Sequence, residues 1–342
     1  MNRALLCCAP LVCTLALAAA PECAAQDAVA EFYRGKQVSI LVGFTPGGSS
    51  SLYSQALSRV MARHLPGSPT FVVQHMPGAG GLTVANHVYN TAARDGTVFA
   101  TTGRTAAIEP LLGNKNARFD GRRFNWLGTA NVEYTTCIAW HTAPVKTLAD
   151  AMTTELIVGG SGNDATEVVF PKAANKLTGT KFKVVLGYHG STELLLAMER
   201  GETQGFCGIG WTFVKLRQGD WLRDKKINIL FQISMQKHPE LPDVPAIIDH
   251  ARTPEDRKVF EFLFAPQEMG WPYFAPPGVP AERVEALREA FEKSLKDPLY
   301  LADAERMGIE VQHLGGAHID RLLERVYATP QDIIDRAKAL GD

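Results

Sequence analysis

A short apolar run, a glycine-rich turn and a helical segment recur in that order along the chain, and this pattern restricts the fold more than any other feature. Residues 37–44, 70–75 and 97–102 are apolar runs with β-branched residues, and the turns 45–51 and 77–83 follow the first two. Such runs predict strands, and the polar residues after each turn predict helix starts. Strands separated by helices favour parallel pairing through right-handed crossovers. The sequence therefore predicts an α/β fold.

The pattern restarts after residue 130, with no sequence repeat between the two halves. The strands predicted in the second half are residues 135–140, 155–158, 182–187, 205–209 and 227–233. The segment from about residue 237 contains only one strand candidate and a predicted helix at residues 281–295, so we expect it to return and pack on the first half.

This order predicts two lobes, each a mostly parallel sheet flanked by helices. Lobe 1 comprises residues 26–130 and 235–342, and lobe 2 comprises residues 131–234. The chain then crosses between the lobes twice, near residues 128–131 and near residues 234–238, and two crossings form a hinge.

Length and composition exclude several classes of protein. With 342 residues, 46% apolar and 21% charged, the chain can bury a sizeable core. Its 35 basic and 36 acidic residues leave a net charge of −1, which argues against a nucleic-acid partner and against electrostatic membrane attachment. The nine histidines lack metal-ligand spacing, and no serine-nucleophile or zinc-protease motif occurs. We therefore expect no metal, no catalytic residue and no enzyme activity.

Nucleotide cofactors are also not expected. Residues 160–165 match the G-x-G-x-x-A pattern of dinucleotide-binding turns, but the acidic residue that should follow about 20 positions later is absent. The sequence also lacks a phosphate-binding G-x-x-x-x-G-K-[ST] loop.

The first 25 residues differ from the rest of the chain. They contain one basic residue, Arg3, then an apolar run over residues 5–20, and they end in Cys23, Ala24 and Ala25. This order is typical of a secretory signal peptide. The alternative is a membrane anchor, which needs about 20 apolar residues, whereas this run is shorter and contains Pro10. We expect residues 1–25 to be removed and the exported protein to be soluble.

Four glycine-rich turns, at residues 45–51, 77–83, 159–164 and 187–191, each stand between a predicted strand end and a predicted helix start. In an open α/β sheet such turns line the crevice beyond the carboxyl ends of the strands, where ligands bind. The free N–H groups at a helix start favour an anion. Together the turns predict a cleft for a polar or anionic ligand.

The cysteines allow more than one interpretation. Removal of the signal peptide leaves Cys137 and Cys207, and a pair in an exported chain favours one disulfide. Two buried free thiols are the alternative. A nucleophilic pair of Cys207 with His189 is conceivable but less favoured. Among the aromatic residues, Trp211 follows a strand end and is expected near the cleft.

Several motifs together resemble the extracytoplasmic receptors of tripartite tricarboxylate transporters, the Bug family of periplasmic solute-binding proteins. The motifs stand at residues 32–36, 42–48, 76–81, 94–97, 187–191, 241–245 and 276–280. The resemblance implies a two-lobed Venus-flytrap protein of the periplasm that acts as a monomer without a cofactor. It also implies a small carboxylated ligand as one partner and the membrane permease subunits of a tripartite transporter as the other.

The resemblance also implies which residues contact the ligand. These are Thr45, Gly47, Gly48, Ser49, Ser51, Ala79, Gly80, Thr102, Arg104, Ser161, Asn163, Asp164, Tyr188, Gly190 and Ser191. The chain departs from the family pattern in the first loop, where Ser51, Ser54 and Gln55 replace Asp, Ala and Arg. These changes predict an unusual ligand.

Arg104 directly follows the strand predicted at residues 97–102, so we expect it at the crevice as the main charged contact to a ligand carboxylate. The alternative is a structural ion pair, for example with Glu109. In binding proteins of this topology the strands that carry Cys137 and Cys207 tend to be neighbours, which supports the disulfide. Two other functions stay open, a periplasmic partner of a signalling system and, less favoured, an enzyme on the same fold.

Overall fold

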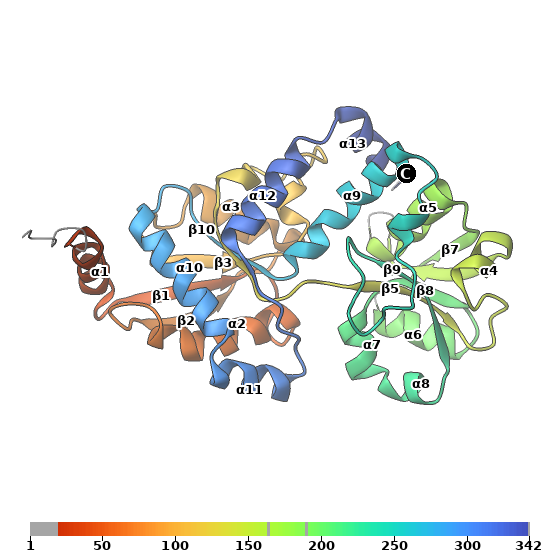
Figure 1. Ribbon diagram of the computed structural model, residues 1–342, viewed down its shortest axis with the longest axis horizontal. Coiled ribbons are helices and arrows are strands. Elements are labelled where there is room, and N and C mark those ends of the chain that lie inside the picture. The colour runs from red at the N-terminus through yellow and green to blue at the C-terminus, as the bar shows by residue number, and fades with distance from the viewer. Residues whose placement is uncertain (1–19, 163–164, 189–190, 341–342) are drawn as a thin grey trace, which may run out of the picture.

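The structure is a computed structural model, which describes residues 20–162, 165–188 and 191–340. It contains two separate β-sheets, and each sheet with its flanking helices forms one lobe. Extended chain connects the two lobes (Figure 1). The prediction of a two-lobed α/β fold is therefore confirmed.

The sheet of the first lobe contains strands from both ends of the sequence. Its order is β11 (Leu314–Gly315), β4 (Asn125–Thr129), β10 (Pro272–Ala275), β3 (Val98–Thr101), β1 (Gln37–Val42) and β2 (Thr70–His75). Strand β1 pairs in parallel with β2 and β3, whereas β10 runs antiparallel to β3 and β4. The C-terminal part of the chain thus completes the first sheet, as expected.

The sheet of the second lobe has the order β7 (Phe182–Leu186), β6 (Leu156–Gly160), β8 (Gly205–Gly210), β5 (Thr135–Trp140) and β9 (Ile227–Ile233). Strand β6 pairs in parallel with β7 and β8. Strand β5 runs antiparallel to both β8 and β9. Both sheets are mixed, but most of their strands run in one direction, namely β1, β2, β3 and β4 in the first sheet and β6, β7, β8 and β9 in the second. The strands next to the crossings, such as β5 and β10, run against their neighbours.

Helices cover both faces of the first sheet. They are α2 (Ser49–Val60), α3 (Leu82–Asn90), α10 (Ala281–Leu295), α11 (Pro298–Met307) and α12 (Gly316–Tyr327), while α1 (Ala20–Tyr33) lies at the outer end of the lobe and contacts α10 (Figure 1). Helix α10 buries Val284, Leu287 and Phe291 at helical spacing against a cluster that includes Tyr53 of α2. Helices α3 and α12 belong to a different cluster. The sheet thus has an apolar core on each side.

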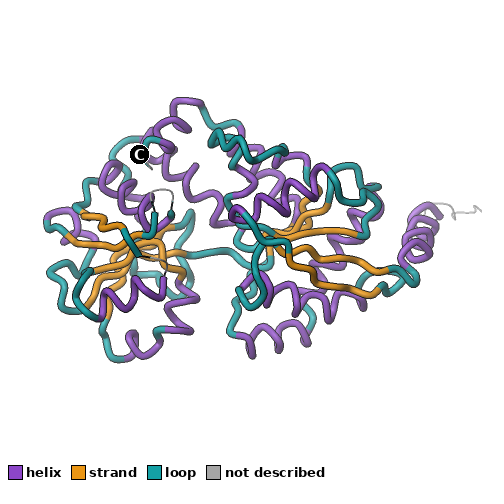
Figure 2. Tube along the Cα trace, turned by 180° about the vertical axis from the view of Figure 1, so that it is seen from behind, coloured by secondary structure: helices purple, strands orange, loops and turns teal. Residues whose placement is uncertain are grey.

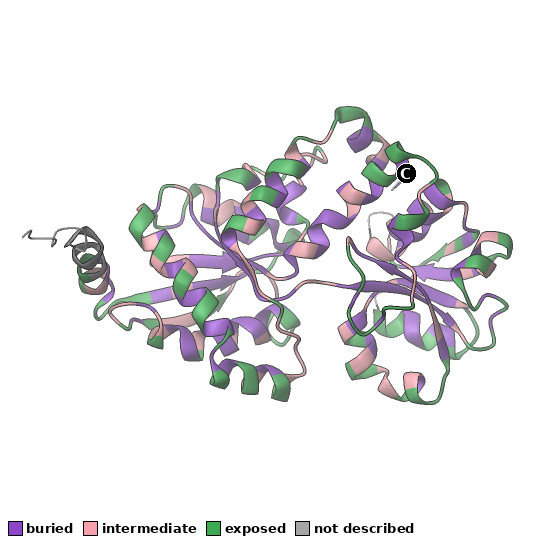
Figure 3. Cartoon of the chain, in the orientation of Figure 1, coloured by how far each residue is buried: buried purple, intermediate pink, exposed green. Residues whose placement is uncertain are grey.

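The second sheet is covered by shorter helices. These are α4 (Leu148–Thr153), α5 (Thr166–Thr178), α6 (Ser191–Glu199), α7 (Trp211–Arg217) and α8 (Gly219–Arg223). Short 3-10 turns complete the helical elements of the described chain at Met61–Arg63, Ala79–Gly81, Ala106–Ile108, Gly121–Arg123 and Ile247–His250. In both lobes the inner strands are buried, whereas the edge strands β2 and β7 and the outer helix faces are partly or fully exposed (Figure 3).

Two crossing segments lie side by side between the lobes. The Asn131 side chain accepts a hydrogen bond from the Trp271 N–H at 3.0 Å, and the Glu133 N–H donates to the Gln267 carbonyl at 2.9 Å. A Cβ on Gly270 would lie 2.0 Å from the Asn131 carbonyl oxygen, so only glycine allows this close approach. The second crossing therefore lies near residue 270.

The prediction of a second crossing at residues 234–238 is wrong. The side chain of Gln232 donates to the carbonyls of Leu241 and Val244, and the Arg252 N–H donates to the Leu177 carbonyl of α5. These bonds hold residues 238–252 on the second lobe. The chain then returns through α9 (Pro254–Met269), which the sequence analysis did not identify.

Helix α9 runs between the lobes, and the C-terminal helix α13 (Gln331–Lys338) packs against it (Figure 2). Thr253 caps the start of α9, because its hydroxyl accepts a hydrogen bond from the Asp256 N–H at 3.0 Å. Phe264 of α9 packs edge-on against Phe170 of α5, with ring centroids 5.6 Å apart. The long apolar face of α9 thus ties the end of the chain to both lobes.

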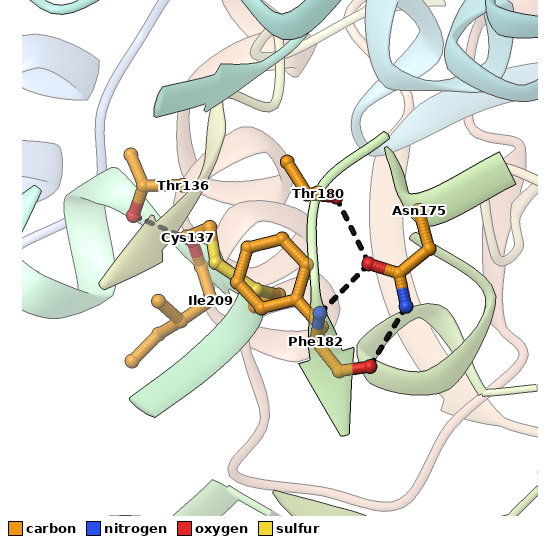
Figure 4. Close-up of a disulfide and its surroundings, with 7 residues drawn as sticks. Thr136, Cys137, Asn175, Thr180, Phe182 and Ile209 are labelled. Carbon is orange, nitrogen blue, oxygen red and sulfur yellow. Dashed lines mark hydrogen bonds between the residues drawn. A yellow bond between two sulfur atoms is a disulfide. The ribbon is translucent and has the colours of Figure 1, made fainter. Parts of the chain in front are cut away.

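Cys137 and Cys207 form a disulfide, which confirms that prediction. They are register partners on the adjacent antiparallel strands β5 and β8. Phe182 lies beside the disulfide, held by Asn175, whose side chain bonds both the N–H and the carbonyl of Phe182 (Figure 4). Because Cys207 is bonded, it is unavailable for a nucleophilic pair with His189, which itself lies outside the described residues.

The predicted signal peptide lies mostly outside the described residues, and the predicted cleavage point after Ala25 falls within α1. The part of α1 that packs on the first lobe comes after this point: Val29 and Tyr33 are buried, and the Tyr33 hydroxyl donates to the Gly96 carbonyl at 3.1 Å. Across the described part of the chain, no helix combines the length and apolarity needed to cross a membrane.

Candidate functional site

The pairing of the strands brings equivalent edges of the two sheets to the hinge. Strand β4 leads into the first crossing and runs parallel to β3 and β1, since both β3 and β4 are antiparallel to β10. Strand β5 begins after the crossing and is antiparallel to β8, so β8 and its parallel neighbour β6 end at the crossing. The carboxyl ends of these strands therefore face the space between the lobes, where ligands of α/β proteins bind.

A cavity of about 580 Å³ opens between the lobes at this edge. Its lining comes from the first lobe, the hinge and the second lobe: Gly47, Gly48, Ser49, Leu52, Tyr53, Asn131, Glu133, Thr212, Phe213, Leu216, Arg217, Trp271, Glu305, Arg306, Met307, Gly308 and Ile309. The size lies within the range of small-molecule binding sites. This cavity is the candidate functional site.

The loop between β1 and α2 supplies the polar wall of the first lobe. Thr45, Gly47, Gly48 and Ser49 are exposed, and the last three line the cavity. In this described loop no side chain caps α2, and no acidic residue occupies its first turn. The first N–H groups of α2 are thus open to an anion at the cavity wall.

Two hydroxyls predicted to contact the ligand are instead buried inside the first lobe. Ser51 Oγ accepts a hydrogen bond from Gln55 Nε2 at 3.1 Å and lies 3.4 Å from His75 Nε2. Thr102 Oγ1 donates to the Gly81 carbonyl at 2.9 Å. From this geometry we do not expect direct ligand contacts from either hydroxyl.

Ala79 and Gly80 are exposed on the turn after β2. Strand β2 is the outermost strand of the first sheet, beyond β1. These two residues therefore stand to the side of the cavity rather than in its lining, and their predicted ligand contact stays a prediction.

Arg104 forms the ion pair that was the alternative to a ligand contact, with Glu133 of the hinge and not with Glu109, the example given for it. The guanidinium lies 3.5 Å from the Glu133 carboxylate, and the side chains are only 23% and 17% exposed. Glu109 instead accepts a hydrogen bond from Asn114. Burial raises the pKa of the Glu133 carboxyl, and nearby Glu310 adds to this rise, while Arg104 opposes it. The sequence analysis missed Glu133, because its role depends on the packing of the loop after a strand of the first lobe against a crossing segment.

The raised pKa of Glu133 predicts a pH-dependent stability. Burial destabilises the ionised carboxylate in the folded protein. The free energy of unfolding therefore falls as pH rises from the usual glutamate range through the raised pKa of Glu133. Relative to Glu133→Gln, the wild-type protein should lose free energy of unfolding over this rise. Urea denaturation of both proteins between pH 4 and pH 8 measures the difference. Parallel curves, or a wild type that gains relative stability with pH, would contradict the assignment.

The second lobe contributes three predicted residues that the structure describes. Ser161 is exposed after β6, and its hydroxyl donates to Glu167. Tyr188 and Ser191 follow β7, with Ser191 starting α6. The predicted Asn163, Asp164 and Gly190 lie outside the described residues. Direct ligand contacts of this group stay predictions.

Helix α7 joins the second lobe to the first beside the cavity. Thr212 Oγ1 and Lys215 Nζ both donate to the Glu310 carboxylate, which stands in the first lobe between α11 and β11. Tyr53 of α2 donates to the Glu310 backbone carbonyl. Trp211 starts α7 as predicted at a strand end, but it is buried and its Nε1 donates to Glu240 at 2.9 Å. The Glu310 carboxylate of the first lobe thus accepts hydrogen bonds from Thr212 and Lys215 of the second lobe and links the two lobes.

This link predicts that Lys215 favours contact between the lobes. Lys215→Met should open the protein and weaken binding of a ligand held by both lobes by a few fold, because partly exposed pairs contribute roughly 1 kcal/mol or less. Small-angle scattering measures the opening. Glu240→Gln is the matched control, since Glu240 pairs with Lys215 at 2.9 Å within the second lobe only. Equal effects of the two variants would show that the link does not set the opening.

Comparison with known proteins agrees with this architecture. The sequence profile of the tripartite tricarboxylate transporter family receptor, TctC, matches residues 55–338. A TctC solute-binding protein from Polaromonas superposes with a TM-score of 0.69 at 19% identity, covering 89% of this chain and 99% of that one.

Two solved structures of relatives carry ligands. A protein of R. palustris solved with adipate has a TM-score of 0.61 at 20% identity, covering 88% of this chain and 97% of that one. MatC from Rhodopseudomonas palustris, solved with bound malate, has a TM-score of 0.57 at 19% identity, covering 90% and 99%. At these identities the likeness shows a shared fold.

Proposed function

Because this chain belongs to the tripartite tricarboxylate transporter receptor family, TctC, we propose that it captures a small carboxylated compound between its lobes and delivers it to the membrane subunits of a transporter. The protein is a solute-binding receptor by family, and the finer assignment to a carboxylate rests on the cavity. The observation that carries it is the uncapped start of α2 in the wall of that cavity. A helix start with open N–H groups binds a carboxylate well.

The ligands of relatives support the same class. The R. palustris protein and MatC hold adipate and malate, and both are small carboxylates. The predicted signal peptide at residues 1–25 agrees with a role in the periplasm, where a soluble receptor meets its ligand before the permease. In this proposal the protein acts as a monomer, without a cofactor and without chemical change of the ligand.

Arg104 is the second element of the proposed carboxylate site; it is not itself part of the cavity lining, but it contacts Glu133, which is. Its guanidinium carries more N–H donors than the single contact with Glu133 uses. A ligand carboxylate beside the start of α2 would accept hydrogen bonds from the donors that remain.

Substitution of Gly48 tests the proposal. Gly48 has φ −79° and ψ 171°, and a Cβ added there meets only the Thr45 carbonyl oxygen, at 4.0 Å, so side chains are accommodated. Gly48→Asp should place its own carboxylate over the first N–H groups of α2, which stabilises the helix by about 1 kcal/mol and weakens binding of a ligand carboxylate at least tenfold. Isothermal titration with carboxylates of increasing length gives the affinities, and thermal unfolding gives the stability.

Gly48→Ala is the matched control, because it adds a Cβ without a charge and should retain binding. If Gly48→Asp binds carboxylates as tightly as Gly48→Ala, the start of α2 is not the site. Native mass spectrometry of protein purified without added ligand identifies any compound that copurifies. An uncharged or cationic compound there would contradict the carboxylate assignment.

A further inference from the structure

Large apolar side chains are exposed inside the interlobe cavity. Phe213 and Leu216, both on α7, are 37% and 53% exposed, and both line the cavity. The first lobe lines the same region with Leu52 of α2 and with Met307 and Ile309 around the end of α11. Exposed apolar groups gathered in a concave surface mark a place where an apolar partner binds.

The apolar groups of the two lobes approach one another at Gly308. A Cβ added to Gly308 would lie 3.1 Å from Leu216 Cδ1, so the side chain of Leu216 reaches the end of α11 in the first lobe. Gly308 has φ +66° and ends α11 in the left-handed conformation. An apolar group in this part of the cavity would therefore contact both lobes and bury Leu216.

The lining of the cavity carries no net charge, because two acidic residues, Glu133 and Glu305, balance two basic residues, Arg217 and Arg306. The lining as a whole therefore does not favour a ligand with two anionic groups. Arg306 is also paired with Asp303. The polar wall at residues 47–49 and the apolar side chains of Phe213 and Leu216 line the same cavity. The cavity thus has one anion-binding wall and one apolar region.

We propose that Phe213 and Leu216 form an apolar subsite with Leu52, Met307 and Ile309, and that the ligand is a monocarboxylate with an apolar chain or ring. The inference rests on the proposed function, because the carboxylate is assigned to the start of α2. Hydroxylated short acids would leave Phe213 and Leu216 in contact with water, whereas an apolar tail removes their surface from water and gains affinity. The cavity volume of about 580 Å³ accommodates such a tail.

A ligand panel with matched variants tests the subsite. The panel contains octanoate and 4-phenylbutyrate, the short acids succinate and malate, the eight-carbon diacid suberate, and 4-phenylbutyramide as an uncharged analogue. Wild-type protein should bind octanoate or 4-phenylbutyrate at least tenfold more tightly than succinate, malate or suberate. Phe213→Ala with Leu216→Ala should weaken binding of that apolar acid roughly tenfold and change binding of the short acids less than twofold. Leu299→Ala is the control, since Leu299 is 57% exposed on α11 but outside the cavity lining, and it should leave all affinities unchanged.

Each other result has a distinct meaning. Tightest binding of succinate, malate or suberate, unaffected by the paired variant, would overturn the apolar subsite and leave the carboxylate receptor intact. Binding of 4-phenylbutyramide as tight as that of its acid, and sensitive to the paired variant, would support the subsite and contradict the carboxylate function. Absence of binding across the panel would overturn both. Circular dichroism and thermal unfolding of the paired variant verify that it folds, as expected for two exposed positions.

Discussion

Replacing Cys137 and Cys207 together by alanine is expected to lower the free energy of unfolding by about 4 kcal/mol. The bond closes a loop with a sequence separation of 70 residues, and the entropy that such a loop removes from the unfolded chain gives this magnitude. Both side chains are fully buried between β5 and β8, so the loss of the sulfur atoms adds a packing cost. Guanidinium denaturation of the oxidised wild type and of the double variant measures the difference.

The reduced wild-type protein is the control, because it retains both sulfur atoms without the bond. Its stability should lie between those of the oxidised protein and the double variant. A loss of less than about 1 kcal/mol in both would contradict a stabilising role for the bond. Two reactive thiols in the denatured, unreduced protein would contradict the bond itself.

Replacing Arg104 by alanine is expected to weaken binding of the ligand carboxylate by about 30-fold or more. The estimate follows from the cost of roughly 2–5 kcal/mol for removing one partner of a desolvated charge pair. The same change leaves the buried Glu133 without its nearest cation, so a loss of stability at neutral pH is also expected. Titration calorimetry and denaturation measure the two effects separately.

The double variant Arg104→Ala with Glu133→Gln separates ligand binding from structure. It removes both charges, so it should recover most of the stability lost in Arg104→Ala but not the affinity. If the affinity also recovers, Arg104 acts only as the partner of Glu133. If Arg104→Ala alone binds like the wild type, the guanidinium does not contact the ligand.

Local patterns in the sequence predicted most strands of the fold. The runs at residues 70–75, 135–140 and 227–233 coincide with β2, β5 and β9, because β-branched and aromatic residues between turns favour extended chain. The helix predicted at residues 281–295 coincides with α10 for a similar reason, since its buried positions recur at helical spacing. The common direction of most strands was also predicted, but the antiparallel strands β5 and β10 were not, because their direction depends on how the crossings enter each sheet.

The sequence by itself determined the two-lobed α/β class, the glycine-rich loop of residues 45–49 and the pair of cysteines, because each depends on neighbouring residues or on residue type. Only the tertiary structure decided that Ser51 and Thr102 are buried within the first lobe. It also decided that Arg104 faces Glu133, and that Lys215 meets Glu310 across 95 positions of sequence. These contacts join side chains from different lobes and crossings, and the packing of whole elements sets such meetings. No local pattern of apolar and polar residues records them.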